Sequence, residues 1–315
     1  MTSEDSSMKE KITVFGSFVV DLMGRTPHLP VPGETVKGSL FKQGAGGKGF
    51  NQAIAAHKAG GDVAMATKLG RDTMAQVATD AMDLVGMPKD YLFYHPEAHT
   101  GIALIMVDEN TSQNMIVIVP GACATITEQD IASVEERIKE SAYLLLQLEV
   151  NQDANEKAAA LARANGVKVI INTAPYQSVS DDFIKGAYLV TPNEVEAEGL
   201  TGVKVTDLAS ADKAAQVLFN KGVENVLITM GSQGVYLNTK GHSEIIPAYK
   251  VNAIDTTGAG DAFNGGLVAG LAEGKSLRDA AAFANAVAAL SVQKLGTTPS
   301  MPTREEIDAF VKERA

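Results

Sequence analysis

The sequence predicts an α/β fold in which helices cover both faces of a mainly parallel sheet. Short runs of β-branched residues alternate with helical patterns along most of the 315 residues, as in parallel strands joined by helices. Hydrophobic residues make up 45% of the chain and charged residues 21%, which is ordinary for a globular protein. A chain of this length can bury one large core, so we expect a disordered leader, residues 1–10, and one domain, residues 11–315.

Each β-branched run is short, and the segment that follows it usually carries a helical pattern. The predicted strands are 12–15, 63–67, 143–148, 167–172, 189–191 and 226–230. The predicted helices between them are 49–59, 72–85, 154–164 and 209–221, and the chain after residue 255 is mostly helical, at 258–272, 276–294 and 303–313.

Two segments break this rhythm. Residues 22–43 carry several prolines and then alternating apolar and polar residues, with no helix. Residues 101–107 and 115–119 read as two strands joined by a turn-rich stretch, so residues 100–119 form a hairpin. Together they predict a small antiparallel sheet, a β lid, that projects from the main sheet. Its exposed face should close over a site or pair with a second subunit.

Charge and cysteine content exclude several classes of function. The net charge of −11 argues against nucleic acid or an anionic membrane as the main partner. No apolar stretch approaches the length of a membrane span, and the N-terminus lacks an apolar signal core. The one cysteine, Cys123, excludes a disulfide framework and reads as an inert side chain in a reducing compartment. We therefore expect a cytoplasmic protein. The five histidines show no metal-binding spacing.

Residues 255–264, Asp-Thr-Thr-Gly-Ala-Gly-Asp-Ala-Phe-Asn, are the most informative stretch. Thr256 or Thr257 can cap a helix whose first turn is Gly258-Ala259-Gly260, and a turn without large side chains leaves its backbone N–H groups free to hold an anion. Asp261 places a carboxylate beside that anion hole. An anion hole with an adjacent base is what phosphoryl transfer to a hydroxyl requires.

A second glycine-rich stretch, residues 44–51, matches neither common phosphate-binding motif. It does not follow the first strand, as the dinucleotide fingerprint should, and Gly49 stands where a P-loop has Ser or Thr. It is either a tight turn before a helix or a loop that admits a ligand, with Lys48 and Asn51 as donors to polyol hydroxyls. Asp21 and Glu149 follow strands and can accept from sugar hydroxyls, although Asp21 also fits an unpaired surface aspartate.

Two further segments carry alternative interpretations. Asn193 and Glu196 open a short helix, where a carboxylate caps the N-terminus or, with the asparagine, organises hydrated Mg²⁺ and nucleotide phosphates. Residues 229–234 follow a strand with a glycine turn and form either a nucleotide-binding edge or a hairpin.

Six blocks in the same order make the chain resemble ribokinase-type (PfkB-family) carbohydrate kinases, from about Ile12 to Phe310. The blocks are 32–36, 46–52, 145–149, 191–194, 227–232 and 255–261. The resemblance implies a ribokinase-like three-layer sandwich with about nine strands. It also implies a β lid, formed by about 22–43 and 100–119, that is often shared across a homodimer.

The resemblance also assigns the site residues. It implies that Asp261 is the base and that the amides of Gly258, Ala259, Gly260 and Asp261 stabilise the transferred phosphate. It assigns the sugar to Asp21, Gly47, Lys48, Asn51 and Glu149. It assigns ATP to Asn193, Thr229, Gly231, Ser232, Gly234, Gly260 and Asn285, and Mg²⁺ to Glu196 through water. It assigns an activating K⁺ to Asp255, Thr257, Ser291, Lys294, Gly296 and Ser300.

One position departs from the family pattern. Members that act on ribose carry asparagine two residues before the sugar-binding aspartate, and this chain has Val19. A valine cannot pair with a ring hydroxyl, and a lost hydrogen bond of this kind costs about 1–3 kcal/mol. The sequence therefore predicts an ATP-dependent kinase for the terminal hydroxyl of a pentose. Ribose comes first, 2-deoxyribose or a ketose is the alternative, and a nucleoside kinase or a non-catalytic sugar-binding protein is less favoured.

Overall fold

Nine strands form one sheet within residues 9–314, the part of the chain that the computed structural model describes. In chain order the elements are β1 (Lys11–Phe15), β2 (Val19–Thr26), β3 (Leu40–Gly46), α1 (Lys48–Lys58), β4 (Asp62–Gly70), α2 (Ala75–Val85), β5 (Leu92–His95), β6 (Gly101–Asp108), β7 (Asn114–Val119), η1 (Gly121–Thr125), α3 (Glu128–Lys139), β8 (Tyr143–Leu146), α4 (Gln152–Ala164), β9 (Lys168–Ile171), α5 (Asp181–Ile184), β10 (Leu189–Val190), α6 (Glu194–Thr201), α7 (Leu208–Asn220), β11 (Val226–Thr229), η2 (Gly231–Gln233), β12 (Val235–Asn238), β13 (Ser243–Ile246), α8 (Ala259–Ala272), α9 (Leu277–Ser291), η3 (Thr298–Ser300) and α10 (Arg304–Glu313).

The main sheet has the strand order β13-β12-β11-β10-β9-β8-β1-β4-β5. Neighbouring strands are parallel from β11 through to β5, and β12 and β13 add an antiparallel edge. The predicted mainly parallel α/β fold is confirmed. Because parallel strands end at the same edge, the loops after β1, β8 and β10 gather on one side of the molecule.

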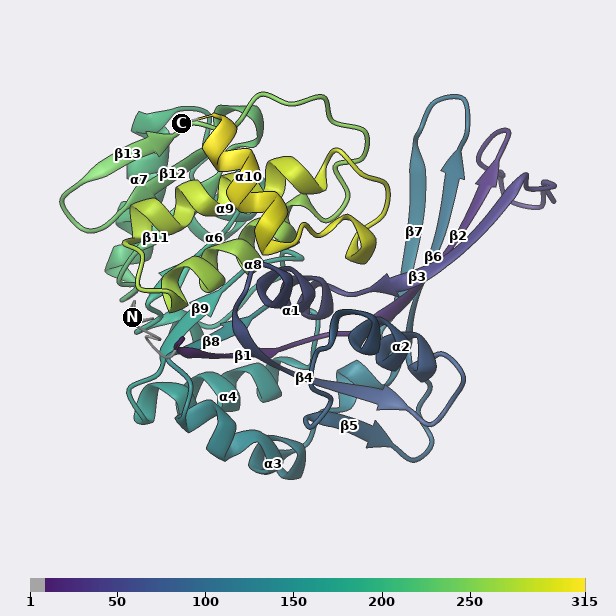
Figure 1. Cartoon of the computed structure of the whole chain (residues 1–315), viewed down its shortest axis with the longest axis horizontal. Helices are drawn as coiled ribbons and strands as arrows, with labels where there is room; N and C mark the ends of the chain where they lie inside the picture. Colours follow the sequence, from purple (N-terminus) through teal and green to yellow (C-terminus); the bar gives the residue numbers. More distant parts are fainter. Residues whose placement is uncertain (1–8, 315) are drawn as a thin grey trace, which may run out of the picture.

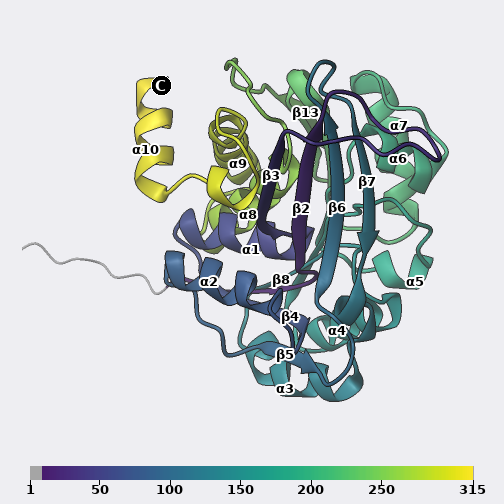
Figure 2. The same ribbon diagram turned by 90° about the vertical axis from the view of Figure 1, so that its right-hand side faces the viewer.

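The helices form two layers, one on each face of this sheet (Figures 1 and 2). Helices α1, α2, α8, α9 and α10 lie on one face, and α3 to α7 lie on the other. Successive strand residues supply both cores: Leu145 packs with the first layer, whereas Leu144 and Leu146 pack with the second. This alternation explains why the central strands are apolar throughout.

The small sheet projects from the main body as the sequence predicts, with the order β3-β2-β6-β7 (Figure 1). The prediction that it is antiparallel is wrong for its central pair, because β2 and β6 run parallel, with Val19 opposite Gly101. Both strands leave the main body at the same root and run outward. The outer pairs, β2 with β3 and β6 with β7, are antiparallel.

Several elements differ from the predicted list. Sequence reasoning omitted β5, α3, α5, β12 and β13. Helix α2 begins at Ala75 rather than at residue 72, because the Asp72 carboxylate accepts from the Ala75 N–H at 3.1 Å and so precedes the helix. Residues 1–8 of the predicted leader lie outside the described residues.

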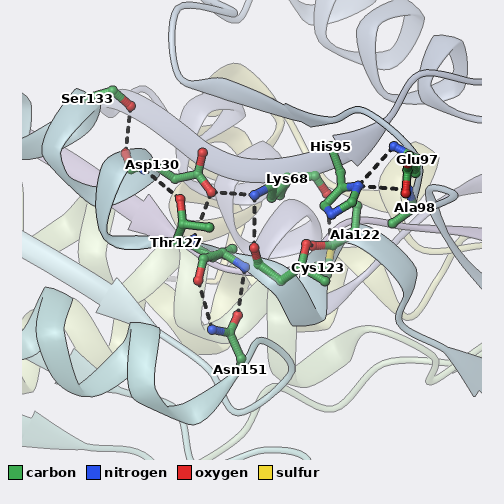
Figure 3. A network of polar contacts seen from close by, with 12 residues as sticks. Lys68, His95, Glu97, Ala98, Ala122, Cys123, Thr127, Asp130, Ser133 and Asn151 are labelled. Carbon is green, nitrogen blue, oxygen red and sulfur yellow. Dashed lines mark hydrogen bonds and ion pairs between the residues drawn. The ribbon is translucent and has the colours of Figure 1, made fainter.

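A buried polar network fixes the segment that follows the last lid strand (Figure 3). The Lys68 ammonium, on β4, donates to Asp130 at 2.6 Å and to the Thr125 carbonyl at 2.9 Å. The Asn151 side chain pairs with both backbone groups of Ile126, at 3.0 and 2.9 Å. These contacts tie the root of the lid to the second helix layer. No helix in residues 9–314 is long and apolar enough to cross a membrane.

Candidate active site

Asp261 lies in the first turn of α8 and is 6% exposed. The Asn51 and Gln52 side-chain amides, both on α1, donate to its two carboxylate oxygens, each at 3.0 Å. Helices α1 and α8 approach closely enough for this because residue 265 is glycine: a Cβ there would lie 2.5 Å from the Ala55 Cβ. The predicted base is thus held by two amides that leave its charge unneutralised.

Carboxylates crowd around a single lysine at this place. Burial raises the pKa of Asp261, and the nearby Lys48 ammonium opposes that effect. Burial acts to lower the pKa of Lys48, but the carboxylates of Asp261, Glu149 and Glu196 together raise it above its ordinary value. Burial, with help from Glu149 and Asp261, raises the pKa of Asp21 from 3.8 to about 6. The site therefore carries excess negative charge, which suits a ligand that arrives with a cation.

The start of α8 differs from the predicted cap. The N-cap is Gly258, in the left-handed conformation at φ 77°, and no side chain caps the helix, so the prediction of a Thr256 or Thr257 cap is wrong. The Thr257 N–H instead donates to the Asp255 carboxylate at 2.9 Å. A Cβ on Gly260 would meet no protein atom within 4 Å. The Ala259 N–H donates to the Thr256 carbonyl at 3.2 Å, whereas no side chain occupies the space beside Gly260. A helix start with no side-chain cap and open space beside it can receive an anion.

The glycines of residues 44–49 serve contacts within the chain itself. A Cβ on Gly47 would lie 2.9 Å from the Phe18 Cα, and one on Gly49 would lie 2.6 Å from the Ser17 nitrogen. A Cβ on Gly46 would lie 2.5 Å from the Asp21 carboxylate. These glycines let the start of α1 pack against the turn between β1 and β2. That packing places Lys48 and Asn51 beside the loop that carries Glu149.

Glu149 joins the turn after β1 to the start of α1. Its Oε2 accepts from the Ser17 hydroxyl at 2.5 Å and from the Lys48 N–H at 2.8 Å. A pocket of about 330 Å³ lies beside it, between the loop after β8 and the lid. Its wall includes Ser17, Val19, Ile118, Cys123, Glu149 and Gln177. Another pocket, of about 280 Å³ and lined by Arg71 and Tyr94, contains none of the predicted site residues.

Val19 and Cys123 belong to the apolar part of this wall. Val19 is 5% exposed, at the root of the lid. The Cys123 sulfur accepts a hydrogen bond from the Phe18 N–H at 3.2 Å and donates one to the Phe18 carbonyl at 3.1 Å. Burial raises the pKa of this thiol to about 11. The expectation that Cys123 is an inert side chain agrees with this environment.

Asn193 and Glu196 cap α6 reciprocally. The Glu196 N–H donates to Asn193 Oδ1 at 2.8 Å, and the Asn193 N–H donates to Glu196 Oε2 at 2.9 Å. The capping interpretation is confirmed. Burial nevertheless raises the pKa of Glu196, while the Lys48 ammonium lowers it and the Asp261 carboxylate adds to the increase.

The other predicted nucleotide residues lie at the β11 end of the sheet. Residues 229–234 connect the antiparallel strands β11 and β12 through η2, so the hairpin interpretation is confirmed. Gly234 has a φ of 102°, and a Cβ there would lie 2.0 Å from the Ile246 carbonyl oxygen. The Asn285 amide is buried and donates to the Pro247 carbonyl at 3.1 Å. Their contact with a nucleotide stays a prediction.

Two of the residues predicted to hold a monovalent cation, Thr257 and Gly296, contact the Asp255 carboxylate through their backbones. This carboxylate accepts from both of their N–H groups, and these bonds lower its pKa although burial opposes them. The hydroxyls of Ser291 and Ser300 donate to carbonyls three residues earlier in the chain. Lys294 pairs with Glu306 at 2.8 Å, so only its backbone is available. In residues 9–314 no group of three or more His, Cys, Asp or Glu side chains could hold a metal.

Sequence reasoning missed the buried amides that support Asp261. Gln52, Gln147, Asn172 and Asn264 are all at most 6% exposed. Gln52 follows the predicted site residue Asn51, and Gln147 stands between two apolar residues. A polar side chain in such a buried position needs a hydrogen-bonding partner, and this was the signal in the sequence that could have revealed the amides.

Comparisons with known proteins agree with this geometry. Residues 9–304 match the family described as pfkB family carbohydrate kinase. The chain is 42% identical to the ribokinase of Haemophilus influenzae over 97% of its own length and 99% of the relative's. It is 35% identical to the deoxyribokinase of Salmonella typhimurium, covering 95% and 98%. The structure of Arabidopsis thaliana ribokinase with ribose and ATP superimposes with a TM-score of 0.90 at 30% identity, covering 97% and 99%.

Proposed function

The chain belongs to the pfkB family of carbohydrate kinases, and from this premise we propose that it transfers the γ-phosphoryl group of ATP to the 5-hydroxyl of D-ribose. The observation that carries the proposal is the pairing of Asp261 with the uncapped start of α8. The buried base stands in the first turn of a helix that no side chain caps, next to Gly260, whose surroundings are open.

In this proposal Asp261 takes the proton of the sugar hydroxyl as that oxygen attacks the γ-phosphorus in line. The amides of residues 258–261 hold the equatorial phosphate oxygens, on which negative charge collects in the transition state. The bonds from Asn51 and Gln52 keep the Asp261 carboxylate directed at the hydroxyl. The sugar is held by Asp21, Gly47, Lys48, Asn51 and Glu149.

The nucleotide and its cations belong on the other side of Asp261. We assign ATP to Asn193, Thr229, Gly231, Ser232, Gly234 and Asn285. The excess of carboxylates around Lys48 fits Mg²⁺ that enters with ATP, and Glu196 would hold its water shell. Carbonyls, hydroxyls and one carboxylate around Asp255 are the donors that K⁺ prefers, and a cation there would add positive charge behind the anion hole.

Val19 favours a second candidate substrate, 2-deoxyribose. The side chain is buried at the wall of the pocket beside Glu149 and offers no hydrogen bond. A sugar hydroxyl that faced it would lose its pairing with water, whereas a deoxygenated carbon would not. The relatives at 42% and 35% identity include one ribokinase and one deoxyribokinase, so overall similarity favours ribose and this residue favours 2-deoxyribose.

A coupled assay of ADP release tests the proposal with ribose, 2-deoxyribose, fructose, psicose and adenosine, each with and without K⁺. We expect turnover with ribose or 2-deoxyribose above the other three, and higher activity with K⁺. No turnover with any of them would refute the kinase proposal.

In the variant Val19→Asn, the kcat/KM for ribose should rise relative to that for 2-deoxyribose, by about tenfold for one regained hydrogen bond. An unchanged ratio would contradict the role of Val19.

A further inference from the structure

Gln52 is fully buried between the predicted base and the centre of the sheet. Its side-chain Nε2 donates to Asp261 Oδ1 at 3.0 Å and to Asn172 Oδ1 at 2.9 Å. Its Oε1 accepts from the Gln147 amide at 2.8 Å. Both N–H groups and the oxygen of this amide are therefore in use, in a place that water does not reach.

The bonds continue from Gln52 until they return to α8. The Asn172 amide donates to the Thr191 carbonyl at 3.1 Å, and the Thr191 hydroxyl donates to Asn264 Oδ1 at 2.6 Å. The Asn264 amide then donates to the Gly260 carbonyl at 2.8 Å. The network thus starts at Asp261 and ends at the residue before it, after passing the carboxyl ends of β9 and β10. It fixes the first turn of α8 relative to the sheet.

The direction of the Gln52 amide is determined by its neighbours. A flipped amide would place Oε1 against the Asp261 carboxylate, and it would turn N–H groups toward the Gln147 donor. The Gln52 backbone packs directly against α8, since a Cβ on Gly265 would lie only 2.6 Å from the Gln52 carbonyl oxygen. Gln52 therefore presents a donor to Asp261 in one orientation only.

We propose that Gln52 is the positioning residue of the base: its amide holds the Asp261 carboxylate in the direction of the acceptor hydroxyl. That Gln52 orients the Asp261 carboxylate follows from the hydrogen bonds alone. That this orientation affects kcat rests on the proposed kinase function. Asn51 donates to the other carboxylate oxygen, but it lies beside the sugar site, whereas Gln52 belongs to the buried network. Asn51 therefore holds Asp261 from the side of the predicted sugar site, and Gln52 holds it from the buried side.

Charged groups from four elements also act on Asp261. Lys48 of α1 stabilises its charged form, whereas Glu149, Asp21 of β2 and Glu196 of α6 oppose it. The Gln52 hydrogen bond lowers the pKa of Asp261 against the larger effect of burial. Removing the amide therefore affects both the direction of the carboxylate and the pH at which it ionises.

The variant Gln52→Met keeps the length of the side chain and removes its donors. We expect kcat to fall by about 10- to 100-fold, because a small misplacement of a reacting group costs up to that much. The KM for ATP should stay within about twofold, since Gln52 is remote from the predicted nucleotide residues, and the acid limb of kcat against pH should move to higher pH. Gln52→Glu, which still accepts from Gln147, serves if Gln52→Met fails to fold.

The control is Thr13→Val, which removes an equally buried hydroxyl whose bond to Ser141, at 2.8 Å, lies away from the site. It should lose stability and keep kcat. A ¹³C NMR titration of Asp261 in the sugar-free protein separates this inference from the kinase proposal, because it needs no turnover. The pKa of Asp261 should be higher in both Gln52 variants than in the wild type. An unchanged titration, or a Gln52→Met kcat within about twofold of wild type, would overturn the inference.

Discussion

At the scale of single residues, Asp261 carries the chemistry by its placement. Two amide donors and one nearby ammonium let a buried carboxylate remain a base. Asp261→Asn keeps the shape of the side chain, but it accepts from only one of the two amides and cannot take a proton. We expect kcat to fall by about 10²–10⁴ while the protein still folds, measured by the coupled assay and by thermal unfolding. A rate near that of the wild type would remove Asp261 from the mechanism.

Asp21 gives a prediction for stability against pH. Its pKa is raised from 3.8 to about 6 in the folded protein, so folding becomes less favourable as pH rises through that window and the carboxylate must ionise while buried. Asp21→Asn has no such cost. Its stability relative to the wild type should therefore grow by roughly 2 kcal/mol between pH 4.5 and 7.5, as measured by urea unfolding. A difference that is independent of pH would contradict the raised pKa.

At the scale of elements, periodicity located most strands and helices, and it failed where tertiary contacts decide. The strand predicted to begin at residue 63 extends over Asp62–Gly70, and the one predicted to end at residue 148 ends at Leu146, because pairing with neighbouring strands sets the ends. Helix α3, with a Thr127 capping box, was missed although its sequence carries that signal. The parallel pairing of β2 and β6 depends on where both strands leave the main sheet, which no local pattern records.

The predicted site shows the same division. Asp261, Lys48, Asn51 and Glu149 could be found because each follows a strand or a glycine turn. The cap of α8 could not, because the left-handed Gly258 packs against Thr297, a residue distant in sequence, and a Cβ on Gly258 would lie 3.1 Å from the threonine Cγ2. The amide network through Gln52 was equally hidden, since the partners of Gln52 lie 95 to 209 residues from it along the chain.

The root of the lid depends on a buried ion pair, which gives a prediction at this scale. The Lys68 and Asp130 side chains are 6% and 18% exposed and lie 2.6 Å apart. Lys68→Met removes the ammonium that neutralises Asp130 and donates to the Thr125 carbonyl, so we expect a loss of about 2–4 kcal/mol in the free energy of unfolding. The double variant Lys68→Met/Asp130→Asn should recover part of it, because no charge is then left buried and the amide oxygen of the new side chain can still accept from the Thr127 N–H. A double variant less stable than the single one would contradict this account.

At the scale of the whole molecule, the lid leaves an apolar face uncovered. Asp21 and Ile118 share the face toward the site, because both are opposite Ala103 in the strand register. Leu104 and Val117 are directly opposed and lie on the other face. Phe41 and Met115 lie on that same face, because they sit at the two ends of the row Phe41, Gly24, Met106 and Met115, two residues along β6 from Leu104. These four side chains are 46–68% exposed. Such a continuous apolar surface on an antiparallel edge is a liability for a monomer.

We propose that a second copy of the chain covers this outer face, which makes the lid a shared element of a homodimer. Sedimentation equilibrium should then give twice the chain mass of 33.1 kDa. Val117→Glu places a charge in the centre of the face and should shift the protein toward monomers, with a rise in the KM for sugar because the lid loses its support. Leu84→Glu is the matched control: Leu84 is 87% exposed on α2, away from the lid, so its substitution should leave the mass unchanged. Dimers that persist in Val117→Glu, or a wild type that sediments as a monomer at micromolar concentration, would exclude this face as the interface.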